Sequence, residues 1–248
     1  MLMGMVLLSV SPTVRQSACQ SPRAANPERP TVATHAYVVA PGYAELEQGV
    51  RAFGVTDLGE GTGWDFNLKI GINRSLQVGF FGTAYVRNGL GSGVGDIGWA
   101  VKWRRAVGPK QGGAVALVPA VTVPTGDAAL GRGAGRALGS LVAVYSADLA
   151  EAWHVDLNAG PTGIGAGKPQ WFASMGASGA MGRWGWALEL FDFTAGGAGP
   201  PQRGVLGATL ITLAEWVVVD VGGVLGATRE TPDQLFVGVT TNLGRIFK

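Results

Sequence analysis

Alternation of apolar and polar residues is clearest in residues 63–73, which read Gly-Trp-Asp-Phe-Asn-Leu-Lys-Ile-Gly-Ile-Asn. Every second residue from Trp64 to Ile72 is apolar, and the residues between them are polar or glycine. A β-strand sends alternate side chains to opposite faces, so this segment would have one apolar face and one polar face. About ten residues of such alternation is the length of a strand that crosses a lipid bilayer.

The pattern repeats along the chain and predicts about twelve strands of bilayer-spanning length. The predicted strands are residues 44–55, 63–73, 76–86, 94–107, 113–123, 140–150, 153–163, 170–180, 184–193, 204–213, 216–226 and 234–245. Some strands are less regular than others. The strand 204–213 is apolar on both faces, so its sides cannot be assigned, and Pro119 and Pro161 each remove a backbone donor from a strand.

The connections between the predicted strands alternate in length. Short connections at 74–75, 108–112, 151–152, 182–183 and 214–215 alternate with longer ones at 56–62, 87–93, 124–139, 164–169, 194–203 and 227–233. Short periplasmic turns and long outer loops are typical of outer-membrane barrels. The fold class predicted is therefore all-β, a closed antiparallel transmembrane barrel of about twelve strands, and an even strand count would place both termini in the periplasm.

Composition supports a strand-built membrane protein. Hydrophobic residues make up 47% of the chain and charged residues only 15%, against a usual ~25% charged. The apolar run from Leu210 to Ala227 contains Glu215, Asp220 and a glycine pair, so it is better explained as two strands than as one helix. All eight tryptophans lie in or at the ends of predicted strands, which is typical of aromatic belts at the membrane interfaces.

The first part of the chain has a different character. Met1 to Val10 resembles the apolar core of a secretion signal, and we assign residues 1–25 to a signal peptide. Cys19, the single cysteine, follows Gln16-Ser17-Ala18 and is best explained as incidental rather than lipidated. Residues 26–43 are predicted to be an extended periplasmic lead-in, and residues 44–248 to form the barrel. The sequence leaves open whether the lead-in plugs the lumen, lines the periplasmic mouth or dangles.

The alternation places a set of charged residues on the inner face of the barrel. These candidate lumen-lining residues are Glu45, Glu47, Arg51, Asp65, Lys69, Asp96, Lys102, Arg104, Asp148, Asp156, Glu189 and Asp220. A basic residue facing lipid near the midplane would cost ~2–4 kcal/mol, whereas water or an opposite charge meets it in the lumen. Two interpretations stay open: a polar solute pathway of mixed charge, or a salt-bridged plug that fills a narrow barrel.

Several short motifs resemble one family of outer-membrane proteins. Arg29-Pro30-Thr31, Val38-Val39-Ala40-Pro41-Gly42 and Glu45-Leu46-Glu47-Gln48-Gly49 resemble the start of the transporter-like barrel family labelled "MetA-pathway of phenol degradation". The motifs Gly93-Val94-Gly95-Asp96-Ile97-Gly98, Val121-Thr122-Val123-Pro124-Thr125-Gly126-Asp127 and Asp156-Leu157-Asn158-Ala159-Gly160 are similar to its later strands. The resemblance implies a porin-like or transporter-like barrel but supplies no ligand. Such barrels commonly end on an aromatic residue read by the barrel-assembly machinery, whereas here Phe247 is penultimate.

The motifs of common catalytic and cofactor sites are absent from the sequence. The chain has only His35 and His154, and it contains no Gly-x-Ser-x-Gly, His-Glu-x-x-His or paired-cysteine motif. We therefore predict no enzyme activity, no cofactor and no metal site. A net charge of +2 without a basic stripe predicts no nucleic-acid partner.

The function expected is an outer-membrane channel or transporter for passive or facilitated passage of small solutes, including aromatic or apolar compounds. The expected partners are outer-membrane lipid, small-molecule solutes and the assembly machinery, and the expected location is the bacterial outer membrane. The alternatives are an outer-membrane lipid hydrolase using His154, a structural or adhesin-like barrel with a blocked lumen, and a soluble β-barrel binder.

Overall fold

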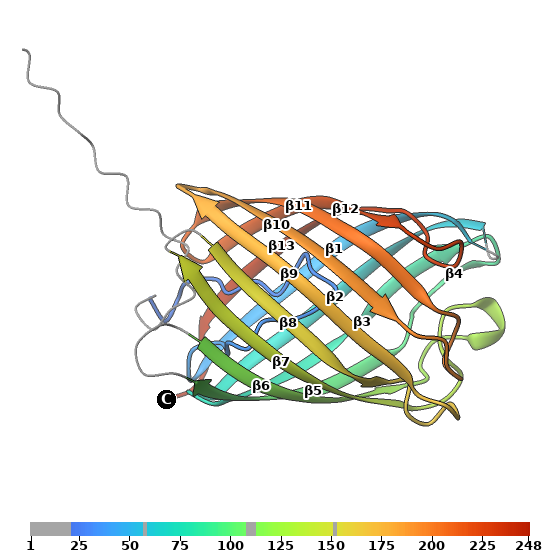
Figure 1. Ribbon diagram of the computed structural model, residues 1–248, viewed down its shortest axis with the longest axis horizontal. Coiled ribbons are helices and arrows are strands. Elements are labelled where there is room, and N and C mark those ends of the chain that lie inside the picture. The colour runs from blue at the N-terminus through green and yellow to red at the C-terminus, as the bar shows by residue number, and fades with distance from the viewer. Residues whose placement is uncertain (1–20, 57–58, 108–112, 151–152) are drawn as a thin grey trace, which may run out of the picture.

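The structure is a computed structural model that describes residues 21–56, 59–107, 113–150 and 153–248. It consists of strands joined by turns and loops, with one short 3-10 helix, Ala128–Leu130 (Figure 1). The strands are β1 (Tyr43–Thr56), β2 (Gly59–Asn73), β3 (Leu76–Asn88), β4 (Gly91–Gly93), β5 (Ile97–Val107), β6 (Gly113–Val123), β7 (Leu138–Ala150), β8 (Trp153–Thr162), β9 (Gln170–Met181), β10 (Trp184–Phe193), β11 (Gln202–Ala214), β12 (Val217–Gly226) and β13 (Gln234–Arg245).

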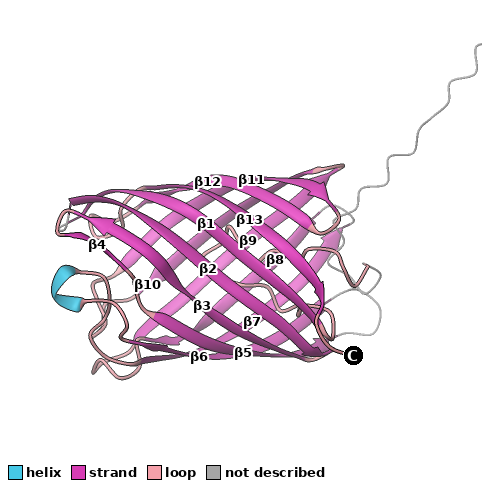
Figure 2. Cartoon of the chain, turned by 180° about the vertical axis from the view of Figure 1, so that it is seen from behind, coloured by secondary structure: helices cyan, strands magenta, loops and turns pink. Residues whose placement is uncertain are grey.

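The strands close into one antiparallel barrel. Each long strand pairs with its neighbours in the chain, and β1 pairs with both β2 and β13, so the sheet has no open edge. The three-residue β4 pairs only with β3, which leaves twelve strands in the barrel wall. The predicted fold class, a closed antiparallel barrel of about twelve strands, is confirmed (Figure 2).

The outer surface of the barrel is apolar because the alternation holds in nearly every strand. Seven of the eight tryptophans are among the exposed large hydrophobic residues, and Trp186 packs edge-on against Trp153 with ring centroids 4.9 Å apart. Most charged residues of the same strands face inward, and Lys69 and Glu189 are each 1% exposed. Within the described residues, no helix is long and apolar enough to cross a membrane.

The connection expected at 56–62 is mostly strand. Residues 59–62 continue β2, because Phe53 of β1 pairs directly with Gly61. A side chain at position 61 would collide with the Phe53 ring, so glycine here provides the room that the inward ring requires. Gly61, in a segment predicted to be a loop, thus reflects close packing inside the barrel.

The two prolines of the wall lie where a ladder is already interrupted. Pro119 faces outward and pairs with Leu141 of β7, while the β5–β6 register skips the positions opposite it. Pro161 pairs with Trp171 of β9 and lies beyond the last β7–β8 pair, Ala143 with Ala159. Each proline therefore stays paired with one neighbouring strand. The hydrogen bonds that its missing backbone N–H cannot make are lost on the other side.

The barrel has two different ends. Connections at 74–75, 182–183 and 215–216 are short, and we call this the short-turn end. The opposite, loop end has the longer connections 89–96, 124–137, 163–169, 194–201 and 227–233. The predicted connections at 108–112 and 151–152 lie outside the described residues, as do Cys19 and most of the assigned signal peptide. The C-terminus lies at the short-turn end (Figure 1).

Candidate functional site

Residues 24–42 run inside the barrel, and we call them the strap. The strap enters at the short-turn end, where the Ala25 amide donates to the Glu215 carbonyl at 2.9 Å. It returns to the same end, where the Gly42 amide donates to the Gly71 carbonyl at 2.8 Å. Of the positions that the sequence left open for this segment, the described residues therefore occupy the lumen (Figure 1).

The first limb of the strap follows β1. The Asn26 amide donates to Glu45 Oε2 at 2.6 Å, and the Glu28 amide donates to Glu47 Oε1 at 2.5 Å. These bonds are charge-assisted, which makes them stronger than bonds between neutral groups.

The Arg29 side chain extends from the strap toward Asp220 of β12, with Nε 3.5 Å from Oδ2. It lies directly over Gly49 and Gly238, where a Cβ atom would overlap its guanidinium. Glycine at these two wall positions therefore makes room for the strap arginine.

The middle of the strap crosses the lumen to β10 and β8. Both oxygens of Glu189 accept bonds from the strap backbone, from the Val32 amide at 2.7 Å and the Ala33 amide at 3.0 Å. Thr34 exchanges two bonds with the Asn158 side chain, its amide donating at 3.3 Å and its carbonyl accepting at 3.0 Å. In this middle part, Glu189 and Asn158 of the wall thus bind the peptide backbone of the strap.

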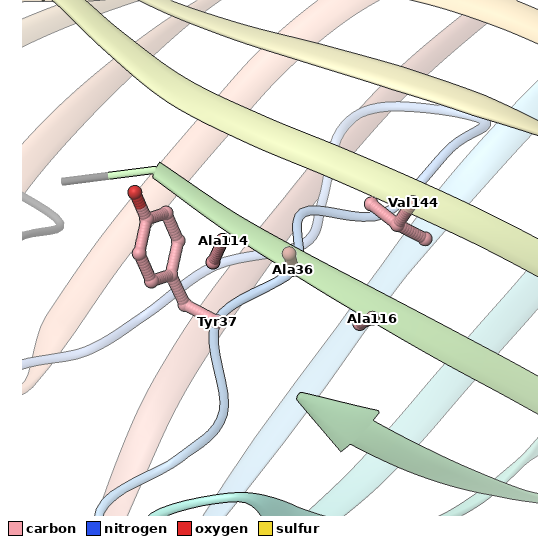
Figure 3. Close-up of a cluster of buried hydrophobic side chains, with 5 residues drawn as sticks. All are labelled: Ala36, Tyr37, Ala114, Ala116 and Val144. Atoms are coloured by element: carbon pink, nitrogen blue, oxygen red, sulfur yellow. The ribbon is translucent and has the colours of Figure 1, made fainter. Parts of the chain in front are cut away.

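The return limb packs against β6 and β7. Ala36 and Tyr37 lie among Ala114, Ala116 and Val144 in a small apolar cluster (Figure 3). The Ala36 amide donates to Ser146 Oγ at 2.7 Å.

The rest of the return limb is held by β5 and β3. The guanidinium of Arg104 lies 5.3 Å from the Tyr37 ring centroid. The Val39 amide donates to Gln77 Oε1 at 2.8 Å. Side chains from opposite sides of the barrel therefore hold the two limbs.

A buried charge cluster joins the strap to the wall. Lys69 Nζ lies 2.6 Å from Glu45 Oε1 and 2.8 Å from Glu47 Oε1. Lys102 Nζ lies 2.6 Å from Glu28 Oε1 and donates to the His35 carbonyl at 2.8 Å. Each ammonium group is thus neutralised by carboxylates, and Glu28 brings a charge of the strap into the cluster.

The electrostatics of the strap favour a fixed protonation state. Burial would raise the pKa of Glu28, but the neighbouring Lys102 and Lys69 hold it well below its usual value, so Glu28 is ionised. Burial, together with the positive charge of Lys102, lowers the pKa of His35 to about 3, so His35 is neutral. The neutral ring accepts a bond at Nδ1 from the Tyr37 amide at 3.2 Å.

The lumen on the loop-end side of the strap contains two adjoining cavities of about 260 Å³ and 200 Å³. Strap residues Glu28 and Thr34 line both cavities. The facing wall is apolar, and its buried cluster continues from Phe172 through Phe191, Leu206, Val224 and Phe236. This apolar inner wall was not predicted, because β11 is apolar on both faces and alternation could not separate its sides.

The structure places all twelve predicted lumen residues at inward positions of the wall or its loop-end rim, and most of them hold the strap. Strap contacts involve Glu45, Glu47, Lys69, Lys102, Arg104, Glu189 and Asp220. The other five form local pairs: Arg51 with Asp65 at 2.6 Å, Asp148 and Asp156 with His154, and Asp96 with the loop amides of Gly126 and Ala134. Whether they form a solute pathway stays a prediction.

Sequence reasoning missed five residues that hold the strap or line the cavities. Glu28 and Arg29 lie in the segment without periodicity, and Asn67, Gln77 and Asn158 are uncharged. The inward parity of the last three was visible in their strands. Their role was not, because it depends on where the strap lies.

The surroundings of His154 do not form a hydrolase site. Its Nδ1 lies 2.7 Å from Asp148 Oδ1 and its Nε2 lies 3.1 Å from Asp156 Oδ1. The neighbouring Ser146 donates its hydroxyl hydrogen to Asp156 rather than to the histidine. A Ser–His–acid mechanism needs one ring nitrogen free to accept the serine proton, and here both nitrogens face carboxylates. Replacing His154 with alanine is therefore expected to leave the rate of hydrolysis of a short-chain ester unchanged in a lipase or deacylase assay.

The acidic residues of the lumen do not make a metal centre. Among the described residues, no group of three or more histidine, cysteine, aspartate or glutamate side chains could hold a metal ion. Glu45 and Glu47 converge on Lys69 instead, so an ammonium group neutralises them.

Replacing Glu189 with glutamine is expected to loosen the strap. The amide NH2 would face a backbone N–H in place of an acceptor, which leaves one buried donor unpaired at about 1–3 kcal/mol. We expect faster hydrogen exchange at Val32 and Ala33, with the barrel strands unaffected. Glu230→Gln, which removes the same charge from an exposed loop position, provides the matched control. Unchanged exchange at Val32 and Ala33 would contradict the role given to Glu189.

Comparison with known proteins identifies the fold through solved structures, but it identifies no family. No family model matches the chain, and no curated protein matches it. The resemblance to the phenol-degradation family therefore stays an interpretation.

Solved outer-membrane barrels share the architecture. The COG4313 outer membrane channel from Pseudomonas putida F1 superposes with a TM-score of 0.61 at 13% identity, covering 84% of this chain and 97% of that one. The KdgM porin gives a TM-score of 0.57 at 9% identity, covering 81% and 99%. The CymD monoaromatic hydrocarbon channel gives 0.51 at 12% identity, covering 84% and 90%. At these identities the likeness shows the fold alone, that of bacterial outer-membrane channels, and the predicted outer-membrane location agrees with it.

Proposed function

We propose that this protein is an outer-membrane channel for the passive or facilitated passage of small molecules, including apolar and aromatic ones. The observation that carries the proposal is the state of the lumen. The wall side chains leave room for a strap of the chain and for cavities of about 260 Å³ and 200 Å³. Eight-stranded barrels are filled by their own side chains and those of about sixteen strands hold a water channel, so a twelve-stranded barrel lies between them.

The strap is proposed to be the barrier that solutes must pass. It crosses the lumen between β1 and β10 and is bound mainly through backbone hydrogen bonds. The apolar contacts of the strap are small: Ala36 and Tyr37 are buried in one cluster with the wall, and Ala33 packs partly buried against another. A segment held mainly by polar contacts can move if water takes the place of its partners, and it need not disrupt a large packed core to do so.

Apolar and aromatic solutes suit the lumen because its inner wall contains phenylalanines at the level of the cavities. Phe81 and Phe172 line the cavities, and Phe172 stacks on Phe193 with centroids 4.6 Å apart. That one barrel of this fold bears the name of a monoaromatic hydrocarbon channel makes aromatic solutes a sensible first choice. The inward charges and the loops at 124–139 and 194–203 are proposed to select among solutes.

Single-channel recording in a planar bilayer tests the proposal. The refolded protein is expected to give discrete, stable current steps, and a solute that occupies the lumen is expected to interrupt them. Benzyl alcohol would serve as the test solute. Sucrose, which has no apolar ring, would serve as the control. Absence of steps from protein shown to be folded by heat-modifiable gel mobility would overturn the proposal.

A permanently closed barrel is the second candidate, and the strap is the observation that favours it. In that case the protein would be structural or adhesin-like, and its loops would carry the function. The recording described above separates the two, because a closed barrel gives no current whatever solute is added.

A further inference from the structure

The two cavities beside the strap share their lining and form a continuous site. Glu28, Thr34, Asn67 and Val118 line both. Among the wall residues that line them, Val118, Ala120, Val142 and Phe172 lie nearer the loop end of their strands than Ala114 and Ala116, which contact the return limb of the strap. The site is therefore floored by the strap and reached from the loop end.

One side of this site is apolar. Val118, Val142 and Phe172 line the larger cavity, and Phe81, Ala100 and Ala120 line the smaller one. An apolar cavity of about 150 Å³ is large enough to bind benzene. Each of the two cavities, at about 260 Å³ and 200 Å³, therefore has room for one substituted ring.

The charged groups at the floor of the site are already paired. Glu28 contacts Lys102 at 2.6 Å, Glu47 contacts Lys69 at 2.8 Å, and Arg29 faces Asp220 at 3.5 Å. A charged ligand would lose its hydration without meeting a free opposite charge, which is unfavourable. The site thus favours neutral molecules.

The site also contains polar side chains that the protein does not use. Among the described residues, neither the Asn67 amide nor the Ser140 hydroxyl takes part in a hydrogen bond, although both line the larger cavity. Asn67 lines the smaller cavity as well, and it faces inward beside Gly79, whose missing side chain leaves its Oδ1 uncovered. A primary amide offers both a donor and an acceptor to a ligand.

We infer that the two cavities form a binding site for neutral single-ring molecules that carry one hydrogen-bonding substituent. The ring packs against Val142 and Phe172, and the substituent bonds to the Asn67 amide. Asn67 is then a specificity-determining residue. This inference deepens the proposed function and rests on it, since it names the class of solute that pauses in the lumen.

Binding to the protein in lipid nanodiscs tests the site, with empty nanodiscs as the background. The probes are benzyl alcohol, toluene, which has the same ring and carbon atoms but lacks the hydroxyl group, and benzoate, which carries a charge. Benzyl alcohol is expected to bind more tightly than either. Benzoate binding as tightly as benzyl alcohol, or no binding of benzyl alcohol above background, would overturn the inference.

Two variants locate the binding. Asn67→Leu is expected to weaken benzyl alcohol binding roughly two- to tenfold, the value of one hydrogen bond, and to leave toluene unchanged. Val142→Trp is expected to abolish binding of both, whereas Leu141→Trp adds the same bulk on the lipid-facing side and should have no effect. Unchanged binding in Asn67→Leu would refute the role of the amide, and this variant decides the question if Val142→Trp does not fold.

The failure of this inference is distinguishable from failure of the proposed function. Current steps in a bilayer without benzyl alcohol binding would overturn the site and leave the channel in place. Binding without current steps would overturn the channel and leave a closed barrel that carries a ligand site.

Discussion

Removal of residues 21–40 is expected to raise the single-channel conductance roughly tenfold, because an emptied twelve-stranded lumen approaches the aqueous channels of wider barrels. The strap spans the lumen from Glu45 and Glu47 on one side to Glu189 on the other. It is therefore the main obstruction in the half of the barrel nearest the short-turn end. Pro41 and Gly42 remain to lead into β1. Recordings from full-length and shortened protein in the same lipid provide the comparison.

A deletion of residues 228–230 controls for a general effect of shortening. These residues lie in the loop-end connection 227–233, away from the strap and outside the loops proposed to select solutes, and their loss is expected to leave the conductance near that of the full chain. Heat-modifiable gel mobility must show that both deletion variants are folded. If the folded protein without its strap conducts no better than the full chain, the wall side chains themselves close the lumen.

Replacing Lys69 with methionine is expected to destabilise the barrel by about 3–5 kcal/mol, the loss typical of breaking a buried ion pair. The Lys69 ammonium is the shared partner of Glu45 and Glu47 and also donates to the Asn26 carbonyl at 2.9 Å. Methionine fills nearly the same space but leaves the carboxylates facing one another without a counter-charge. Denaturant unfolding followed by tryptophan fluorescence measures the change.

Two comparisons make this prediction specific. Lys168→Met removes a lysine from an exposed loop position and is expected to have little effect. Adding Glu45→Gln and Glu47→Gln to the Lys69 variant is expected to restore most of the stability, since glutamine can still accept from the strap amides. If the triple variant is no more stable than Lys69→Met alone, the loss comes from packing rather than from unpaired charge.

The barrel could be predicted from sequence because lipid and lumen impose opposite demands on neighbouring residues. In β2, Trp64, Phe66 and Leu68 face outward while Asp65, Asn67 and Lys69 face inward. That contrast repeats in most strands and fixes their positions to within a few residues. It fails in β11, where Leu206 and Ala208 face an apolar part of the lumen and the two sides look alike.

The candidate site was predictable only in part. The sequence predicted which charges face inward, because parity alone decides that. It did not predict what they bind, because their partners are the backbone amides of residues such as Asn26, Val32 and Ala33. A backbone amide is the same in every residue and leaves no mark on the sequence.

The path of the strap also determines how the barrel can be assembled. Both limbs leave through the short-turn end, at Ala25 and at Gly42, so the strap is a loop and no free chain end passes through the ring of strands. The strap can enter the lumen through the short-turn end after β1 has paired with β13. It can leave by the same route without opening the wall. Closure of the barrel and occupation of its interior are therefore separable steps.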